Sequence, residues 1–200
     1  MTTESIFRVA FWVLFGGVLA MRIAFGIRVR RAGERVMPDQ EAVEREGRVM
    51  FAFRVVLFFA LIAWLVLYTV NPPWMEALSI PFPGWLRWIG FAIGLVSLGF
   101  WVWAQAVLGK EWSPQLQLRE EHLMVTAGPY GRIRHPIYTA MIGFGISLVL
   151  VTANWVFAAF AVLVIAGLFA RAPREEQMMI EEFGEEYKAY MQRTGRFFPK

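Results

Sequence analysis

Five apolar segments divide the chain into stretches that are long enough to form membrane helices. They lie at about residues 5–27, 50–70, 84–108, 136–152 and 155–170, and each is rich in Leu, Val, Ile, Phe and Trp. Only Ala153 and Asn154 separate the last two segments, which are short, so they predict a tight helical hairpin. The pattern predicts an all-α integral membrane protein with about five transmembrane helices; a four-span arrangement is the alternative.

A different periodicity follows the last apolar segment. Residues 174–192 carry Met179, Phe183, Tyr187 and Tyr190 at intervals of three or four residues, with charged residues between them. This spacing predicts a cytoplasmic amphipathic C-terminal helix that lies against the bilayer or the helix bundle.

Composition supports the membrane class and removes several kinds of chemistry. Hydrophobic residues make up 58% of the 200 residues, and the mean hydropathy is +0.47. Such a chain has no room for a separate soluble catalytic domain, so we expect one membrane domain over residues 1–200. The absence of cysteine excludes disulfides and thiolate ligands, and two histidines without a ligand motif predict no metal site.

The distribution of basic residues predicts the orientation. Sixteen Lys and Arg lie in residues 28–48, 110–134 and 171–200, whereas residues 71–83 and the hairpin turn carry none. The positive-inside rule then places the N-terminus outside and the C-terminus on the cytoplasmic face. An active site formed by the basic segments would lie on that cytoplasmic face. Basic loops beside anionic headgroups also account for the net charge of +4, so no nucleic acid is expected.

Some polar and small residues fall within the apolar segments. The arginines lie near predicted helix ends, where we expect their long side chains to anchor the helices by reaching the headgroups. Gly90 and Gly94 form a small-xxx-small pair that predicts close helix packing. The arginines in question are Arg8, Arg22, Arg54 and Arg87.

A polar cluster, GPYGRIRHPIY at residues 128–138, precedes the fourth apolar segment. Gly128 and Pro129 indicate a turn, and Pro136 suits the first turn of a helix. The positive end of that helix, together with Arg132 or Arg134, favours binding of an anion such as a carboxylate. The alternative, equally open at this point, is that these arginines contact lipid phosphates.

A second cluster, RAPREE at residues 171–176, follows the hairpin, which returns the chain to the same membrane face. Glu175 and Glu176 could simply complement the dipole of a helix N-terminus. Combined with Arg171 and the first cluster, they predict a composite site for a zwitterion. Carboxylates would accept from an ammonium or from ribose hydroxyls, and arginines would hold a carboxylate.

The two clusters together resemble the carboxyl-terminal half of the isoprenylcysteine carboxyl methyltransferase family, and are similar in places to phospholipid methyltransferases. GPYGRIRHPIY, then RAPREEQMMIEEFGEEYKAY, carry the resemblance over about residues 109–190, and residues 108–113 resemble the loop before them. The resemblance implies S-adenosylmethionine as cofactor in a cytoplasmic pocket. It also implies a lipid-like or prenylated small-molecule substrate that enters from the bilayer, with helices 1–3 in residues 1–108 and the catalytic half in residues 109–200.

The resemblance also assigns residue roles. Arg171 and Arg134 would be catalytic, with Arg171 orienting an acceptor carboxylate that needs no strong base because it is already ionised at pH 7. The residues implied in cofactor binding are Gly128, Tyr130, Arg134, His135, Tyr138, Glu175 and Glu176.

One departure leaves the acceptor open. Eukaryotic members carry an additional arginine in the helix before the loop, whereas residues 88–109 contain no basic residue here. The acceptor is then an isoprenylcysteine-like or other amphiphilic carboxylate, or alternatively a phospholipid or small molecule methylated on nitrogen or sulfur. An NADPH-dependent membrane reductase, which lacks support from a GxGxxG motif, and a non-enzymatic membrane scaffold are the competing classes.

Overall fold

The computed structural model describes residues 3–31, 47–108 and 124–200, and their regular elements are helical, as predicted. All five apolar segments form helices, and the third and fourth have the predicted bounds. The α-helices are α1 (Thr3–Arg31), α3 (Arg48–Val70), α4 (Gly84–Leu108), α5 (Pro136–Thr152), α6 (Trp155–Phe183) and α7 (Glu185–Arg193). Two short 3₁₀ helices, η1 (Pro73–Leu78) and η3 (Gly128–Gly131), lie in the connections.

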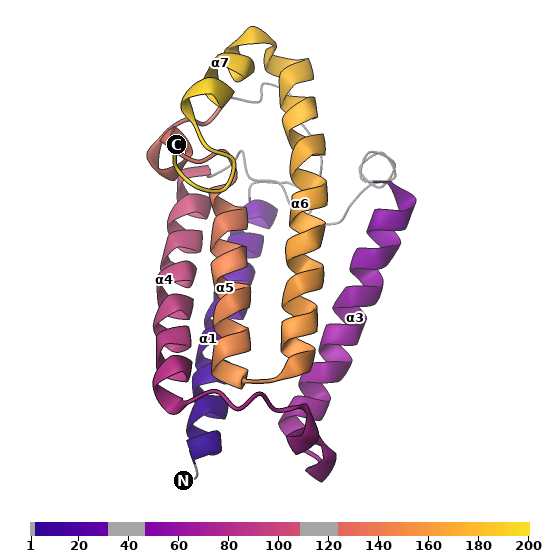
Figure 1. Ribbon diagram of the computed structural model, residues 1–200. Coiled ribbons are helices and arrows are strands. Elements are labelled where there is room, and N and C mark those ends of the chain that lie inside the picture. Colours follow the sequence, from indigo (N-terminus) through magenta and orange to yellow (C-terminus); the bar gives the residue numbers. More distant parts are fainter. Residues whose placement is uncertain (1–2, 32–46, 109–123) are drawn as a thin grey trace.

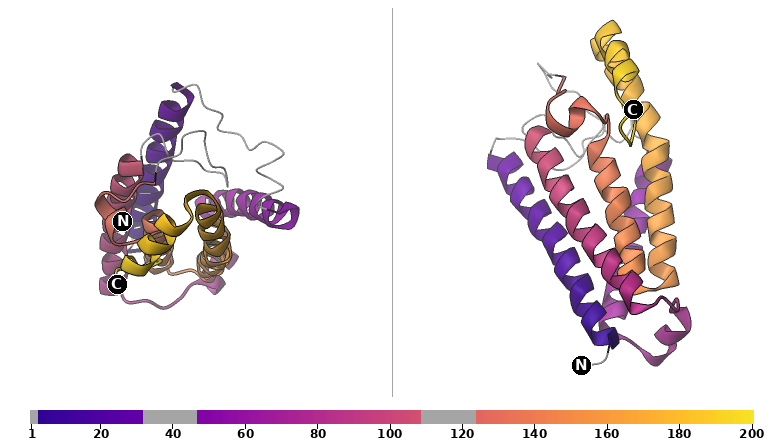
Figure 2. Two further views of the ribbon diagram at one scale, coloured as in Figure 1. Left: turned by 90° about the horizontal axis from the view of Figure 1, so that it is seen from above. Right: turned by 60° about the vertical axis from the view of Figure 1, so that its left-hand side comes forward.

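The five long helices run roughly side by side, and the chain reverses direction from each to the next (Figure 1). The N-terminus therefore lies at one end of the bundle, and the C-terminus lies near α7 at the other. Helices α1, α4, α5 and α6 stand next to one another, whereas α3 lies apart when the bundle is seen from above (Figure 2). We call the two ends the α7 end and the N-terminal end.

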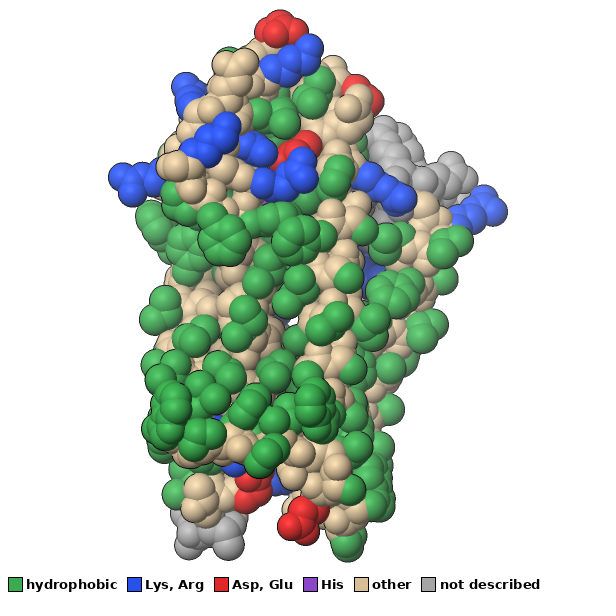
Figure 3. Space-filling model, in the orientation of Figure 1, with side chains coloured by type: hydrophobic (Ala, Val, Ile, Leu, Met, Phe, Trp, Pro, Cys, Tyr) green, Lys and Arg blue, Asp and Glu red, His purple; other side chains and the backbone are tan. Residues whose placement is uncertain are grey.

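The surface of the bundle fits a membrane. Helices α1, α3, α4 and α6 are long and apolar enough to cross one, while α5 has 17 residues. At 1.5 Å per residue α5 is about 25 Å long, slightly less than the roughly 30 Å hydrocarbon core. Hydrophobic side chains cover the body of the bundle, and Lys and Arg gather at the α7 end (Figure 3). The predicted class, an all-α integral membrane fold, is confirmed.

Helices α4 and α5 form the most closely packed pair. A Cβ added at Gly90 would lie 2.4 Å from Cβ of Leu150, and one at Gly94 would lie 2.4 Å from Oγ of Ser147. These glycines therefore let the two helices approach more closely than any larger side chain would permit. The packing role predicted for the pair is confirmed.

The predicted hairpin between α5 and α6 is also confirmed. Ala153 adopts a left-handed conformation at φ 47°, which ends α5. Asn154 then starts α6, because its Oδ1 accepts hydrogen bonds from the backbone N–H groups of Val156 at 2.9 Å and Phe157 at 3.4 Å. Such an N-cap satisfies backbone donors that have no partner within the helix. The reversal brings the residues beyond α6 back toward those before α5.

The sequence-based boundary of α6 was wrong. The fifth helix was expected to end near residue 170, with a separate amphipathic helix from residue 174, but α6 continues through Pro173 to Phe183. Across the proline, Nε of Arg171 donates to Oε1 of Glu175 at 2.8 Å, an i,i+4 ion pair that supports a helix. The helix ends at Gly184, whose φ of 55° suits glycine, and α7 follows as a separate short helix.

Arginine at the N-terminal end of the bundle contacts protein groups, where we had expected contact with lipid. The side chain of Arg87 is 8% exposed, and its Nε and Nη2 donate to the carbonyl of Val151 at 3.0 and 2.8 Å. Its Nη1 also donates to Glu4 at 2.7 Å, and its guanidinium lies 4.0 Å from the ring centroid of Phe7. Arg87 thus joins α4 to the start of α1 and the end of α5.

Arg8 makes the equivalent connection to α3. It donates to the carbonyl of Tyr68 and, at 2.5 Å, to Oδ1 of Asn71, and its guanidinium lies 4.4 Å from the ring centroid of Tyr68. Both arginines anchor helices, as expected, but they do so by binding carbonyl groups at the C-terminal ends of neighbouring helices. Those ends carry a partial negative charge.

Candidate functional site

The segment before α5 begins with a tight turn. Gly128 has a φ of 55°, a conformation that favours glycine, and a Cβ placed there would lie 3.1 Å from a methyl group of Val107. The turn continues as η3 and positions Tyr130 in the interior, where its carbonyl accepts a 2.6 Å hydrogen bond from the hydroxyl of Tyr190. Burial raises the pKa of Tyr190 to about 12, so that hydroxyl stays protonated and can donate.

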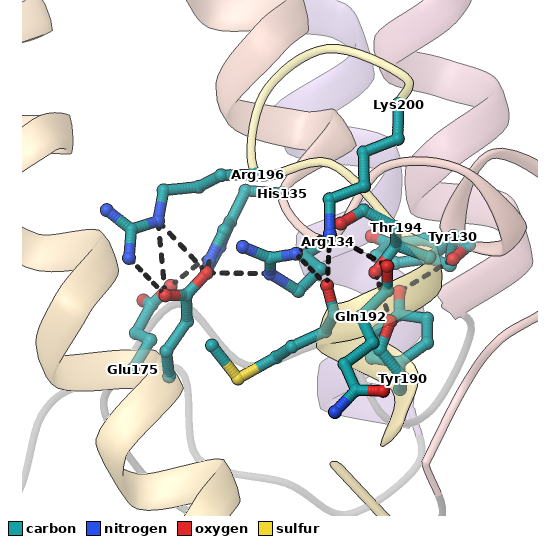
Figure 4. A network of polar contacts seen from close by, with 11 residues as sticks. Tyr130, Arg134, His135, Glu175, Tyr190, Gln192, Thr194, Arg196 and Lys200 are labelled. Carbon is teal, nitrogen blue, oxygen red and sulfur yellow. Dashed lines mark hydrogen bonds and ion pairs between the residues drawn. The ribbon is translucent and has the colours of Figure 1, made fainter. Parts of the chain in front are cut away.

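His135 stands immediately before α5, whose first residue is Pro136, as the sequence predicted. The side chains of Arg134 and His135 then extend toward the glutamates of α6 (Figure 4). The local sequence explains why α5 starts here, because proline needs no hydrogen-bond partner in the first turn and its ring fixes the start of the helix.

Glu176 is the most enclosed carboxylate of the site, with a side chain only 4% exposed. Its Oε1 accepts from Nε of Arg134 at 2.8 Å and lies 3.3 Å from Nε2 of His135. Nε of Arg196 lies 3.1 Å from both of its oxygens. Three cationic or potentially cationic groups from two distant segments therefore surround one buried carboxylate.

Glu175 links the two sequence-predicted clusters. Its Oε1 accepts from the hydroxyl of Tyr138 at 2.6 Å and from Nε of Arg171 at 2.8 Å, and its Oε2 lies 3.5 Å from Nδ1 of His135. The ring of His135 stacks on that of Tyr138, with centroids 5.2 Å apart and planes 17° from parallel. The histidine therefore lies between the two glutamates with both ring nitrogens facing carboxylates.

This position shifts the pKa of His135. Burial alone disfavours the charged imidazolium and lowers the pKa, but hydrogen bonds and charges from Glu175 and Glu176 outweigh burial and raise it above the ordinary value. The site thus favours the protonated form of the ring. Three guanidiniums and this histidine face two carboxylates, so the described cluster carries excess positive charge and suits an anionic group such as a carboxylate.

The structure brings most of the sequence-predicted residues into one network. Arg134, His135 and Tyr138 from one cluster contact Glu175 or Glu176 from the other, with Arg171 paired to Glu175. Two predicted residues lie to one side: Gly128 forms the turn, and the carbonyl of Tyr130 accepts a hydrogen bond from Tyr190. The predicted loop at residues 108–113, except Leu108, and His122 lie outside the described residues.

Sequence reasoning missed Arg196. It belongs to a short segment after α7 that pairs with the residues before α5: the backbone N–H groups of Arg134 and His135 donate to the carbonyls of Gly195 and Arg196 at 2.9 and 3.0 Å. No motif marked this segment, because a single arginine after a predicted surface helix is typical of a solvated terminus. The glycine at residue 195 was the one sign of a specific backbone conformation there.

Part of the chain matches a known protein family in sequence. Residues 88–181 match the model of the "Isoprenylcysteine carboxyl methyltransferase (ICMT) family". The match begins upstream of the predicted stretch, within α4, and ends before the FGEEY element that we had included.

Individual relatives carry two kinds of name. The chain is 32% identical to protein-S-isoprenylcysteine O-methyltransferase B of Arabidopsis thaliana, over 56% of this chain and 61% of the relative. It is 28% identical to the cobalt-zinc-cadmium resistance protein CzcN of Cupriavidus metallidurans, over 58% of this chain and 56% of the relative. The chain therefore spans less than two thirds of either protein.

Among solved structures, the chain is similar to the eukaryotic intramembrane Ras methyltransferase ICMT (isoprenylcysteine carboxyl methyltransferase). The TM-score is 0.54 at 20% identity, covering 95% of this chain and 67% of that one. At this identity the likeness concerns the fold. The resemblance predicted from the two motifs is thereby confirmed: residues 88–181 match the isoprenylcysteine carboxyl methyltransferase family.

Proposed function

We propose that the protein is a membrane methyltransferase that uses S-adenosylmethionine to methylate the carboxylate of an amphiphilic, isoprenylcysteine-like substrate. The observation that carries this proposal is the contact between the segment before α5 and the first turns beyond the apolar part of α6. Residues 134–138 and 171–176 are distant in sequence, and both lie in the family match. Side chains of the first segment bind the two glutamates of the second.

The cluster has groups that complement the cofactor. S-adenosylmethionine supplies a methyl group on a sulfonium, together with an amino-acid carboxylate, an ammonium and ribose hydroxyls. Arg134 and the positive end of α5 suit the carboxylate, and Glu175 suits an ammonium or hydroxyl donor. Because Glu176 is already surrounded by cations, its role in this proposal is to hold Arg134 and His135 in place.

The acceptor would approach Arg171. This arginine directly follows the continuous apolar stretch of α6, where the polar head of an amphiphile would meet the edge of the bundle. A guanidinium can orient a carboxylate while one of its oxygen lone pairs attacks the methyl carbon, displacing the sulfur as a neutral thioether. The carboxylate is ionised at neutral pH, so the step needs no general base.

Two further features belong to the same proposal. The name of the Arabidopsis relative supports a prenylcysteine carboxylate as acceptor, whereas the bacterial relative is named for metal resistance. The basic residues at the α7 end support a cytoplasmic site, with the N-terminus on the opposite side of the membrane.

Calorimetric titration of the detergent-purified protein tests the cofactor. We expect saturable binding of S-adenosylmethionine and S-adenosylhomocysteine and none of NADPH. Binding of NADPH alone would indicate a reductase, and binding of none of the three by a folded sample would favour a scaffold.

Methyl transfer from labelled cofactor tests the acceptor, using N-acetyl-farnesylcysteine and its carboxyl amide. We expect labelling of the acid alone, and we expect Arg171→Lys to lower kcat more than cofactor affinity. Glu182→Gln, an exposed substitution on the same helix, is the matched control. Equal labelling of acid and amide would rule out the carboxylate as the methylated group.

A further inference from the structure

The segment Thr194–Phe197, which we call the C-terminal clasp, lies beyond the family match yet contacts the site on several sides. It pairs with residues 132–135 in a short parallel arrangement: the N–H of Gly195 donates to the carbonyl of Arg132 at 3.0 Å. Together with the two bonds from Arg134 and His135 described above, this leaves the backbone before α5 fixed by residues from the far end of the chain.

Side chains extend the same connection. The hydroxyl of Thr139, one turn into α5, donates to the carbonyl of Phe197, and Nη1 of Arg134 donates to the carbonyls of Thr194 and, at 3.1 Å, Met191. The ring of Phe197 lies 5.9 Å from that of His135. Arg134 therefore binds Glu176 with Nε while the clasp holds Nη1, so its guanidinium has a defined orientation.

The clasp is itself anchored, unlike a frayed chain end. Oγ1 of Thr194 donates to the carbonyl of Tyr190 at 2.6 Å, and Nζ of Lys200 donates to the carbonyls of Met191 and Gln192 at 3.0 and 2.8 Å (Figure 4). A Cβ added at Gly195 would come within 1.7 Å of the carbonyl oxygen of Phe198. The backbone at residue 195 is thus too tightly folded for any residue except glycine.

Arg196 adds a charge to this framework. Its side chain is 41% exposed, but its guanidinium reaches the enclosed Glu176, and both hydrogen bonds to Oε2 within the described part of the chain come from Arg196. Arg134 and His135 share the other oxygen. Arg196 therefore fixes the rotation of the carboxylate and directs Oε1 toward the two residues before α5.

We propose that the C-terminal clasp completes the site, with Arg196 acting through Glu176 as a positioning residue for Arg134 and His135. This inference rests on the proposed function, because the groups it positions are those assigned to the cofactor. Arg196 itself need not touch the cofactor or the acceptor. The clasp makes cofactor binding depend on residues that follow the family match.

Substitution of Arg196 tests the clasp. For Arg196→Gln we expect S-adenosylmethionine to bind at least about tenfold more weakly, as loss of one charged hydrogen bond implies, with acceptor KM little changed. Arg196→Lys should restore part of the affinity, because a lysine keeps the charge but not the two-pronged contact. Arg193→Gln, a neighbouring exposed arginine, should bind normally. Equal affinity in the unsubstituted protein and in these three variants would overturn the proposal.

Glycine at position 195 offers a second variant that changes no charge. Gly195→Ala should displace the clasp and weaken cofactor binding to at least the same extent as Arg196→Gln. If the Gly195→Ala protein folds and binds normally, the backbone pairing has no part in the site and the proposal fails.

A titration of His135 separates failure of the clasp from failure of the proposed function, because it needs neither cofactor nor acceptor. His135 faces Glu175 and Glu176 from α6, Arg134 and Tyr138 on its own segment, and Arg196 across the shared Glu176. Removing Arg196 withdraws a like charge, which alone would raise the pKa of His135, but it also frees the Glu176 carboxylate to rotate away from the ring, which lowers that pKa.

If Arg196 directs Oε1 of Glu176 toward His135, Arg196→Gln should lower the pKa of His135 toward its ordinary value, measured by NMR of ring-labelled histidine with His122→Gln used for assignment. An unchanged or higher pKa would show that Arg196 does not act through Glu176. If the unsubstituted protein bound no S-adenosylmethionine but this shift appeared, the clasp would stand and the proposed function would fail.

Discussion

Buried or half-buried arginines lie at both ends of the bundle, but their partners differ. At the N-terminal end, Arg8 and Arg87 donate to backbone carbonyls where α3 and α5 finish, and also to the side chains of Asn71 and Glu4. At the α7 end, Arg134 and Arg171 bind carboxylates of α6, with a histidine between those carboxylates. The arginines at the N-terminal end bind partial negative charges at the ends of helices. The α7 end instead brings several ionisable side chains together, and their positive charges outnumber their negative ones.

The difference shows why a buried arginine near a membrane helix end is not by itself a sign of chemistry. Arg87 donates with Nε and Nη2 to the Val151 carbonyl at the end of α5 and with Nη1 to Glu4, so it has a complete structural explanation. At the α7 end, two glutamates from one helix are shared by residues that were far apart in sequence. Sharing of this kind fixes side-chain directions, which a binding site needs and a helix anchor does not.

The largest expected effect is at the α7 end. Glu176→Gln removes the charge that holds three cationic groups together, so cofactor affinity should fall about 100-fold, or roughly 3 kcal/mol, as expected when a buried ion pair is broken. Calorimetric binding of S-adenosylmethionine measures it, with Glu181→Gln on the exposed side of α6 as control. An affinity within twofold of the unsubstituted protein would remove Glu176 from the site.

The reciprocal substitution at the N-terminal end should separate stability from binding. Arg87→Leu leaves the carbonyl of Val151 without two hydrogen bonds and Glu4 without its partner, so we expect a loss of about 2–3 kcal/mol in the free energy of unfolding. Cofactor affinity should be unchanged. Arg87→Lys, which keeps the charge, should lose less. Weakened cofactor binding without loss of stability would show that the two ends are not functionally distinct.

Packing between α4 and α5 connects the two ends, and it can be disturbed without changing charge. Gly94→Ala places a Cβ 2.4 Å from Oγ of Ser147, so overpacking should cost about 1–3 kcal/mol in thermal or denaturant unfolding. Gly99→Ala is the matched control, because nothing lies within 4 Å of its added Cβ. Alanine there should stabilise the helix slightly, by up to about 1 kcal/mol. Equal effects would argue against close packing at Gly94.

The smallest effect is a pH dependence that only the α7 end should show. The pKa of His135 is raised in the folded protein, so its contribution to stability is complete below the unfolded pKa of about 6.5 and is lost as pH rises through the folded value. Stability should therefore fall with rising pH above about 6.5, by no more than about 1.4 kcal/mol per unit.

Melting temperatures in detergent across this range provide the measurement. The fall should disappear in His135→Gln and persist in both His122→Gln and Arg87→Leu. A fall that survives in His135→Gln would assign the dependence to another group and weaken the distinction between the ends.

Much of the fold was predictable from local patterns, since a run of apolar residues long enough to cross a bilayer has few alternatives to a helix. The start of α5 was predicted because proline acts on the backbone nearest to it, and the start of α4 and the hairpin were predicted from the bounds of the apolar segments. The end of α6 was missed because the apolar run stops at residue 170, whereas the helix continues across Pro173 with Arg171 paired to Glu175.

The sequence also singled out the two segments that meet in the candidate site, because RHPIY and REE are contiguous motifs whose polar residues stand out against apolar flanks. What it could not determine was which charge meets which, since that depends on how α5 and α6 pack and on where the chain goes after α7. Glu176 binds Arg134 from 42 residues upstream and Arg196 from 20 residues downstream. Sequence patterns record neighbours along the chain, whereas these partners became neighbours only when the helices packed and the C-terminal segment returned to the site.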